Sequence, residues 1–435
     1  MPLTNAPNVP LSNQALIKQS MKKLMKIETE KLKKLAYLLI SASPGGFKIF
    51  VLAVIGLISN GQIQGEIAND LAIISFLSLL TAIGAGIQIL HLIPKKESEA
   101  KIAAEIFKGI LLKLNALILP ACGLLLVYNT YFSSILNEGF GSVILLFLTS
   151  LYWLFRHFFL SRQNLAQLFL MEAISWGVSI LGFSYLYITS APLAQNIIYV
   201  LVLSYIASIT LPTLTLAKHK ANFKCKIFKD AITVGLSNLS SGGIINLAPS
   251  ICFHIGSAPS AGAIGLIINI SSTAITVIRA HLNRTIPEIS AAILNREPTE
   301  FHILRKFAQN KINKIALLSF FIMQPFMIFI VNESQPNLPL AETLALSILT
   351  TAFVYTPQFS AVDSIVINFF GRAGSMLAIN IAHATIVGLV TLAFYIASQL
   401  STYSIYIFLS TSITLYILRN LIVKKIVSAE DISKK

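Results

Sequence analysis

The segment Ser41–Gly61, SASPGGFKIFVLAVIGLISNG, joins an apolar run of membrane-helix length to residues that such helices rarely carry. Pro44, Gly45 and Gly46 loosen a helix, and in a bilayer the backbone groups they free need partners in neighbouring helices or in water. Lys48 follows, and a lysine deep in the bilayer is costly unless it faces a protein-lined, hydrated interior. The segment therefore predicts a bent transmembrane helix whose lysine faces a cavity that accepts an anionic group.

The composition of the whole chain is that of an all-α, polytopic membrane protein. Of its 435 residues, 55% are hydrophobic and only 12% are charged, and the mean hydropathy is +0.75. An ordinary soluble enzyme does not have this balance. The three cysteines show no pairing or metal-ligand spacing, and the sequence holds no phosphate-binding loop, nucleophile elbow or HExxH motif. We therefore predict neither an enzyme nor a metal site.

Twelve apolar segments are long enough to cross about 30 Å of hydrocarbon. They are 35–59, 67–93, 106–128, 140–160, 165–187, 197–216, 231–254, 261–282, 315–331, 340–370, 376–400 and 403–423. Lysine and arginine gather before the first segment, after each even-numbered one and after the last, whereas the other connections hold none. The positive-inside rule then predicts that both termini are cytoplasmic. Because the basic residues are dispersed over many connections, they do not indicate nucleic-acid binding.

A lysine-rich connection divides the chain into two halves of six segments each. Ser43-Pro44-Gly45-Gly46 in the first half has a counterpart in Ser240-Ser241-Gly242-Gly243 in the second, which indicates a parallel repeat. The alternative is that any twelve-helix protein divides this way without duplication. The predicted organisation is a basic cytoplasmic segment 1–34, a six-helix bundle 35–217, a cytoplasmic linker 218–230, a second six-helix bundle 231–423 and a tail 424–435.

Four cations are candidates for binding an anionic substrate in the cavity. Lys48 lies about 13 residues into its segment, roughly 20 Å along a helix and therefore near the midplane. It contacts substrate or, alternatively, forms an ion pair with Glu172, which lies at similar depth in the fifth segment. Arg279, His281 and Arg284 end the eighth segment at the basic side, where guanidinium groups suit phosphate. The alternative for Arg284 is a positive flank of the helix.

Four titratable residues within the segments are candidates for coupling transport to H⁺ or Na⁺, namely Glu172, Asp363, Asp70 and His383. Asp363 follows Pro357, and an acid beside a proline is typical of a kinked gating helix. The alternative is a kink whose polar groups are satisfied locally. A lone membrane histidine is more often a hydrogen-bonded packing residue. The candidate hinge residues are Pro44, Gly45, Gly46, Gly242, Gly243 and Pro357.

The layout resembles the multidrug/oligosaccharidyl-lipid/polysaccharide (MOP) exporter superfamily, most closely the Wzx-type flippases of O-antigen and capsule repeat units. The resemblance covers 35–423 and rests on the two halves, on Gly45-Gly46-Phe47-Lys48, on Gly61 and on Thr81-Ala82-Ile83-Gly84-Ala85-Gly86. The family often has an acidic residue before the glycine of the second helix. Ala82-Ile83-Gly84 stands there in this chain, so no acid is carried over.

This resemblance implies two MATE-like bundles in an inverted V around a cavity lined by the first, second, seventh and eighth helices. The implied substrate is an undecaprenyl-diphosphate-linked oligosaccharide, moved from the inner to the outer leaflet of a bacterial cytoplasmic (inner) membrane by alternating access. The cavity would hold the diphosphate and sugars, and the lipid tail would stay outside between the bundles. The implied partners are this lipid-linked oligosaccharide, membrane lipids and the polysaccharide polymerase and chain-length machinery. No cofactor is implied beyond a coupling H⁺ or Na⁺.

Two other functions remain as alternatives. A MATE-type multidrug or cation antiporter favours acids and aromatic residues in its cavity, often an acid in the first helix, where this chain has Lys48. A membrane-embedded polymerase or ligase would carry a long outer loop with charged catalytic residues. The connections without lysine or arginine are all short, so the sequence argues against that enzyme.

Overall fold

The computed structural model describes residues 39–40, 42–93, 99–131, 135–223, 228–295, 297–369, 373–396 and 402–429. The predicted basic segment 1–34, part of the linker and the end of the tail lie outside the described residues. Within the described ranges the regular elements are helices. The first helix is Ala42–Ile58. It is followed by α2 (Gly61–Ser78), η1 (Leu79–Ile83), α3 (Gly84–Leu92), α4 (Ala100–Tyr131), α5 (Gly139–Ser161), α6 (Leu165–Ile188), α7 (Ala194–Ala217), α8 (Phe228–Ile255), α9 (Ala258–Leu294), α10 (Pro298–Ser334), α11 (Leu340–Tyr355), η3 (Thr356–Ser360), α12 (Ala361–Phe369), α13 (Ala373–Ile396) and α14 (Thr402–Ala429).

The all-helical, multi-pass class predicted from the composition is confirmed. Ten helices in the described part of the chain are long and apolar enough to cross a membrane, and the shorter apolar helix Ala42–Ile58 precedes them. The helix α8, which contains the predicted seventh segment, is described but is not among these ten. The count of twelve spans and the cytoplasmic placement of both termini therefore stay predictions.

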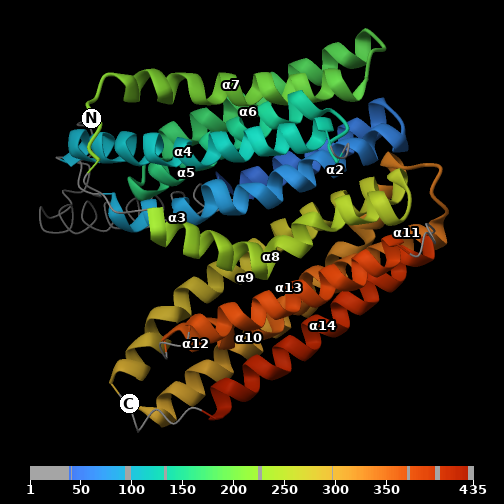
Figure 1. Cartoon of the computed structure of the whole chain (residues 1–435). Coiled ribbons are helices and arrows are strands. Elements are labelled where there is room, and N and C mark those ends of the chain that lie inside the picture. The colour runs from blue at the N-terminus through green and yellow to red at the C-terminus, as the bar shows by residue number, and fades with distance from the viewer. Residues whose placement is uncertain are drawn as a thin grey trace, which may run out of the picture.

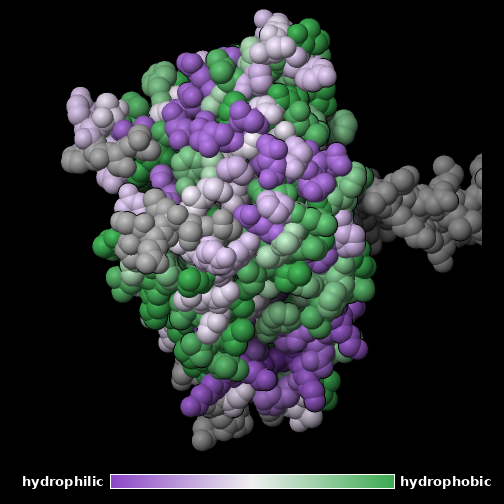
Figure 2. All heavy atoms as spheres, turned by 90° about the vertical axis from the view of Figure 1, so that its right-hand side faces the viewer, coloured by the Kyte–Doolittle hydropathy of each residue, from purple (hydrophilic) through white to green (hydrophobic). Residues whose placement is uncertain are grey.

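The helices form two groups that lie closest at one end and diverge toward the other (Figure 1). We call the first helix to α7 the amino-terminal bundle and α8 to α14 the carboxyl-terminal bundle. The bundles meet where α2 packs against both α8 and α9. Figure 2 views the end at which they meet and shows hydrophilic residues over its upper and its lower part. The interface between the bundles therefore runs along α2, η1 and α3 on one side and α8 and α9 on the other.

Small residues let α2 and α9 approach closely at this end. A Cβ atom built on Gly65 would overlap the backbone of Ala258, and one built on Gly265 would lie 3.1 Å from the Cβ of Ala68. Gln335 donates a hydrogen bond to Gln64, and Gln64 donates one to the backbone oxygen of Leu52 at 2.7 Å. Close backbone approach and buried amide hydrogen bonds are the usual means of joining helices in a membrane. We call this contact, formed by Gln64, Gly65, Ala258 and Gln335, the interbundle seam.

Two predicted segments are much shorter than the helices that contain them. We predicted 261–282 and 315–331, whereas α9 and α10 each contain 37 residues. Hydropathy marks only the part of a helix that crosses lipid, and a polar extension can stay helical because it needs no apolar face. Pro298 also occupies the start of α10, where proline fits the helix because its missing N–H would be unpaired. Residues 283–314, which the hydropathy pattern leaves as a basic connection between the two predicted segments, are therefore mostly helical.

The helix interruptions differ from those predicted. Residues 42–58 of the first helix are all helical, so Pro44, Gly45 and Gly46 do not interrupt it. The bend predicted there from Pro44, Gly45 and Gly46 stays a prediction. The second helix has a π-helical turn at Leu79–Ile83 that the sequence did not indicate. A 3₁₀ turn at Thr356–Ser360, which contains Pro357, separates α11 from α12.

Candidate functional site between the two bundles

Lys48 lies in a small pocket whose walls come from both bundles. Its Nζ donates a hydrogen bond to Ser75 Oγ of α2 at 2.7 Å. The pocket is lined from the first helix, α2, α8 and α9 by Lys48, Leu52, Ala68, Leu71, Ala72, Ser75, Asn246, Pro249, Gly265, Ile268 and Asn269. These are the first, second, seventh and eighth helical segments in chain order. The lysine therefore faces the protein interior between the bundles.

The charge of Lys48 is not balanced by an acid in this pocket, because no carboxylate is among its lining residues. The polar neighbours are neutral, namely Ser75, Asn246 and Asn269. Each asparagine donates its side-chain N–H to the carbonyl four residues earlier in its own helix, at 2.9 Å for Asn246 and 2.7 Å for Asn269. A partly buried ammonium with only neutral partners is electrostatically suited to receive an anion.

The pocket has a volume of only about 30 Å³. A cavity needs roughly 10 to 15 Å³ of such space to hold one water molecule, so this one has room for two or three waters. A substrate headgroup could enter only if the bundles separated around Lys48. The space beside Lys48 is therefore of water size in this conformation, and the predicted hydrated chamber stays a prediction.

A second, larger cavity lies beside this pocket and shares α2 and α8 with it. It encloses about 720 Å³ and is lined mainly by apolar residues of α8 and α13, with Phe76 of α2 and Tyr128 of α4. Phe76 follows Ser75, and Leu247 follows Asn246. Consecutive residues thus line the polar pocket and the larger cavity, which we call the apolar groove. An amphiphilic molecule would find a cation and an apolar surface on adjacent faces.

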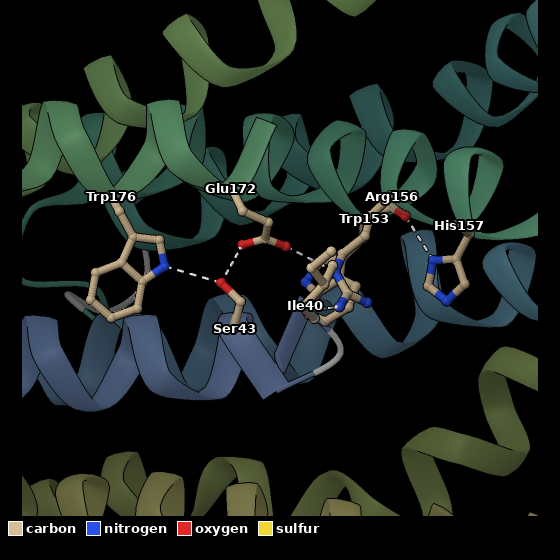
Figure 3. Close-up of polar contacts among 7 residues, drawn as sticks. All are labelled: Ile40, Ser43, Trp153, Arg156, His157, Glu172 and Trp176. Atoms are coloured by element: carbon tan, nitrogen blue, oxygen red, sulfur yellow. Dashed lines mark hydrogen bonds and ion pairs between the residues drawn. The ribbon is translucent and has the colours of Figure 1, made fainter. Parts of the chain in front are cut away.

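Glu172 forms a buried ion pair with Arg156 rather than with Lys48. Arg156 Nε of α5 lies 3.1 Å from Glu172 Oε1 of α6. Ser43 of the first helix donates to the other carboxylate oxygen at 2.8 Å and accepts a hydrogen bond from Trp176 Nε1 at 3.0 Å. Figure 3 shows Ser43 between Glu172 and Trp176. The alternative in which Glu172 neutralises Lys48 is therefore wrong.

Asp70 binds the amino-terminal end of α5 from its buried position in α2. Its carboxylate accepts hydrogen bonds from the backbone N–H groups of Asn137 at 2.9 Å and Glu138 at 3.1 Å, and from Ser142 Oγ at 2.6 Å. The N-cap residue of α5, Glu138, makes no capping bond with its own side chain. A carboxylate at a helix N-terminus is favourable because it accepts from N–H groups that lack partners in the helix. These contacts give Asp70 a structural role.

Asp363 of α12 forms an ion pair with Arg305 of α10, with Nε and Oδ1 2.7 Å apart. Gln309 adds a second link, because its side chain donates to the backbone oxygen of Gln358 at 3.2 Å and accepts from Val362 N–H at 3.2 Å. The 3₁₀ turn beside Pro357 is thus held against α10. The sequence indicated the break but not these partners.

His383 and Arg419 belong to a buried cluster within the carboxyl-terminal bundle. Arg419 Nε donates to Asn380 Oδ1 at 2.9 Å. The ring of His383 lies 4.2 Å from that of Tyr416, and its Nε2 has no hydrogen-bond partner among the described residues. Sequence analysis missed Arg419 because it lies near the basic end of its segment, where an arginine is an ordinary flank.

The other candidate residues are placed as follows. Arg279, His281 and Arg284 belong to α9, but their side chains lie outside the described part of the structure. Among the glycines, Gly45 packs closely on Thr273, Gly46 faces Trp176 and Gly243 faces Phe76, whereas a Cβ on Gly242 would meet no atom within 4 Å. In the described ranges, no group of three or more His, Cys, Asp or Glu residues could hold a metal ion.

Comparisons with known proteins were made at the level of sequence and of structure. No family model matches the sequence, and no curated protein matches it. The structure is similar to that of the eukaryotic MATE transporter AtDTX14, with a TM-score of 0.59, 12% identity and coverage of 94% of this chain and 97% of that chain. It is also similar to an inward-facing multidrug resistance MATE family transporter of the MOP superfamily, with a TM-score of 0.57, 17% identity and coverage of 93% and 96%. A MATE in complex with MaL6 gives a TM-score of 0.53, 14% identity and coverage of 93% and 97%. The chain therefore has the MATE fold.

Proposed function

We propose that this chain is a membrane transporter that exposes a site between its two bundles alternately to the two sides of the membrane. The position of Lys48 carries this proposal, because both bundles contribute to its pocket and the pocket is closed to about 30 Å³. A substrate held there must be admitted by a movement of one bundle against the other. The MATE fold supports the proposal, since the structures that share it are of transporters.

The comparisons favour a MATE-type multidrug or cation antiporter over a lipid-linked oligosaccharide flippase. The similar structures are described as MATE transporters, and one of them as a multidrug resistance transporter. This likeness concerns the fold alone, and it covers nearly the whole of both chains. Antiport of an organic amphiphile against H⁺ or Na⁺ is therefore the first candidate function.

A flippase for an undecaprenyl-diphosphate-linked oligosaccharide is the second candidate, and two observations favour it. The pocket presents Lys48 without a carboxylate, an arrangement that attracts a diphosphate and repels a cationic drug. The apolar groove of about 720 Å³ lies on the adjoining faces of α2 and α8 and has space for part of a lipid chain. A substrate with an anionic headgroup and an apolar tail would use both surfaces.

The two candidate functions predict that the purified full-length protein transports different molecules in proteoliposomes. A flippase moves a fluorescent polyprenyl-diphosphate oligosaccharide between leaflets, and Lys48→Ala abolishes this movement while the variant stays folded in the membrane. An antiporter instead drives ethidium across the membrane in response to a proton or sodium gradient. Transport of neither probe by the unmodified protein would contradict both candidates. If the protein moves the polyprenyl-diphosphate probe, complementation of a panel of flippase-deleted strains would identify the glycan.

A further inference from the structure

The carboxyl-terminal bundle holds a second polar cavity at the end away from the interbundle seam. This cavity encloses about 410 Å³ between α10, α12 and α14. Arg305, Lys306 and Gln309 line it from α10, Asp363 from α12 and Lys424 from α14. None of these residues lines the Lys48 pocket or the apolar groove. The cavity is therefore separate from the proposed transport site.

The charges of this cavity do not balance. Arg305 pairs with Asp363 at 2.7 Å, which neutralises one cation with the only carboxylate of the lining. Lys306 and Lys424 are exposed, and neither side chain forms an ion pair or hydrogen bond with another described residue. Two ammonium groups from different helices thus flank one hollow. Such a pair attracts a group with a full negative charge and several acceptor oxygens.

The wall of the cavity is fixed by its own hydrogen bonds. Gln309 donates to Asn313 Oδ1 at 2.8 Å and to the backbone oxygen of Gln358 at 3.2 Å, while its Oε1 accepts from Val362 N–H at 3.2 Å. Together with the Arg305–Asp363 pair, these bonds tie α10 to η3 and α12. The polar lining is therefore shaped before any ligand arrives, which lowers the ordering cost of binding.

Exposed apolar side chains border the cavity on α10, η3 and α14. Phe359 is among the lining residues and is 37% exposed, and Ile303 and Phe307 of α10 are 63% and 61% exposed. On α14, Leu421 and Ile422 are exposed near Lys424. A free anion gains nothing from this apolar border, whereas a phospholipid carries acyl chains directly beside its phosphate.

We propose that this cavity binds the phosphate headgroup of an anionic phospholipid, with Lys306 and Lys424 as the recognising cations and the acyl chains along α10 and α14. Basic pockets between transmembrane helices suit such headgroups. The bound lipid joins the ends of α10 and α14 and steadies α12 between them. This lipid site is separate from the site of the transported substrate. The proposal therefore holds for an antiporter and for a flippase alike.

Matched variants of the purified full-length protein test the proposal. Lys306→Gln with Lys424→Gln removes one lysine of the cavity from each of α10 and α14. Lys311→Gln with Lys425→Gln removes one exposed lysine from each of the same helices, and neither of these residues lines the cavity. Both double variants lose the same charge, so a general effect of charge would appear in both.

Binding of phosphatidylglycerol and cardiolipin is titrated by native mass spectrometry, with phosphatidylcholine as the uncharged comparison. Because each basic residue contributes about fivefold to binding an anionic surface, we expect the cavity variant to bind these lipids about 30-fold more weakly. The control variant keeps the affinity of the unmodified protein. Equal loss in both variants, or equal binding of phosphatidylcholine, would overturn the proposal. Competition by millimolar inorganic phosphate alone would show a free-anion site and would equally overturn it.

Discussion

Gln335, which follows α10, donates a hydrogen bond to Gln64 of α2 and so links the two bundles through a buried amide pair. Both side chains are buried, at 2% and 0% exposure. A buried amide that loses its partner costs free energy, so the pair opposes separation of the bundles at this end. The interbundle seam is thus the contact that must break before this side of the protein can open.

Gly65→Ala is expected to destabilise the closed seam. A Cβ at this position would overlap the backbone carbonyl of Ala258, and backbone cannot move aside as a flexible side chain can. Such overpacking costs about 1 to 3 kcal/mol, measured as a lower thermal unfolding temperature of the purified protein. Gly242→Ala is the matched control, because its Cβ would meet nothing within 4 Å. The control should gain about 0.5 to 1 kcal/mol from reduced backbone freedom. Equal effects of the two substitutions would contradict the seam.

Arg156→Met should destabilise the amino-terminal bundle strongly. It leaves the carboxylate of Glu172 buried without its ion-pair partner, a change that costs about 3 to 5 kcal/mol. In the double variant Arg156→Met with Glu172→Met, no unpaired charge remains, so most of that stability should return. The measurement is chemical unfolding of all three variants in detergent micelles. Additive losses in the double variant would show that the two side chains do not depend on each other.

Asp70→Asn should weaken the start of α5 without changing transport. The substituted amide has one acceptor oxygen in place of two, so it cannot serve Asn137, Glu138 and Ser142 together. Loss of a helix-capping interaction costs about 0.5 to 2 kcal/mol, which thermal unfolding can measure. A variant with unchanged stability and lost dependence on H⁺ or Na⁺ would instead assign Asp70 to ion coupling.

Glu138→Gln should stabilise the protein at neutral pH. Glu138 lies in the connection before α5, where burial, Asp70 and Glu66 raise the pKa of its carboxyl above the ordinary 4.5. The folded state then holds this proton more tightly than the unfolded state, so the unmodified protein loses stability as pH rises through the two pKa values. The advantage of Gln should therefore disappear as pH falls below 4.5. Thermal unfolding of both proteins across this range measures the difference, and a constant advantage at every pH would show that the carboxyl charge is not its cause.

The sequence allowed the fold class to be predicted because hydropathy is a local property. Apolar runs of sufficient length must be membrane helices, and the structure confirms an all-helical protein with the MATE fold. The lengths of α9 and α10 could not be predicted in this way, because the polar extension of a helix carries no hydropathy signal. Prediction of the inter-residue partners failed for a different reason. The alternative pairing of Glu172 with Lys48 was based on depth alone, and only tertiary packing places Arg156 beside Glu172.

The candidate site was predicted in part. Lys48 was singled out as a buried cation, and the structure places it between the bundles beside Ser75. Asn246 and Asn269 were not singled out, because an asparagine in a membrane helix can equally bond to its own backbone, as both of these do. Arg419 was missed because a basic residue near a helix end has an ordinary explanation. Such side chains become candidates only when their neighbours are known.

The contacts of Ser43 and Arg156 with Glu172 and Ile40 fasten the start of the first helix to α5 and α6. Lys48 therefore belongs to the amino-terminal bundle, whereas Asn246 and Asn269 belong to the carboxyl-terminal bundle. In the alternating transport that we propose, a molecule bound tightly to both bundles would hold them together and slow their relative movement. Turnover then demands a hold that is weak on at least one wall, so the tightest binder of this pocket should be an inhibitor and not a cargo.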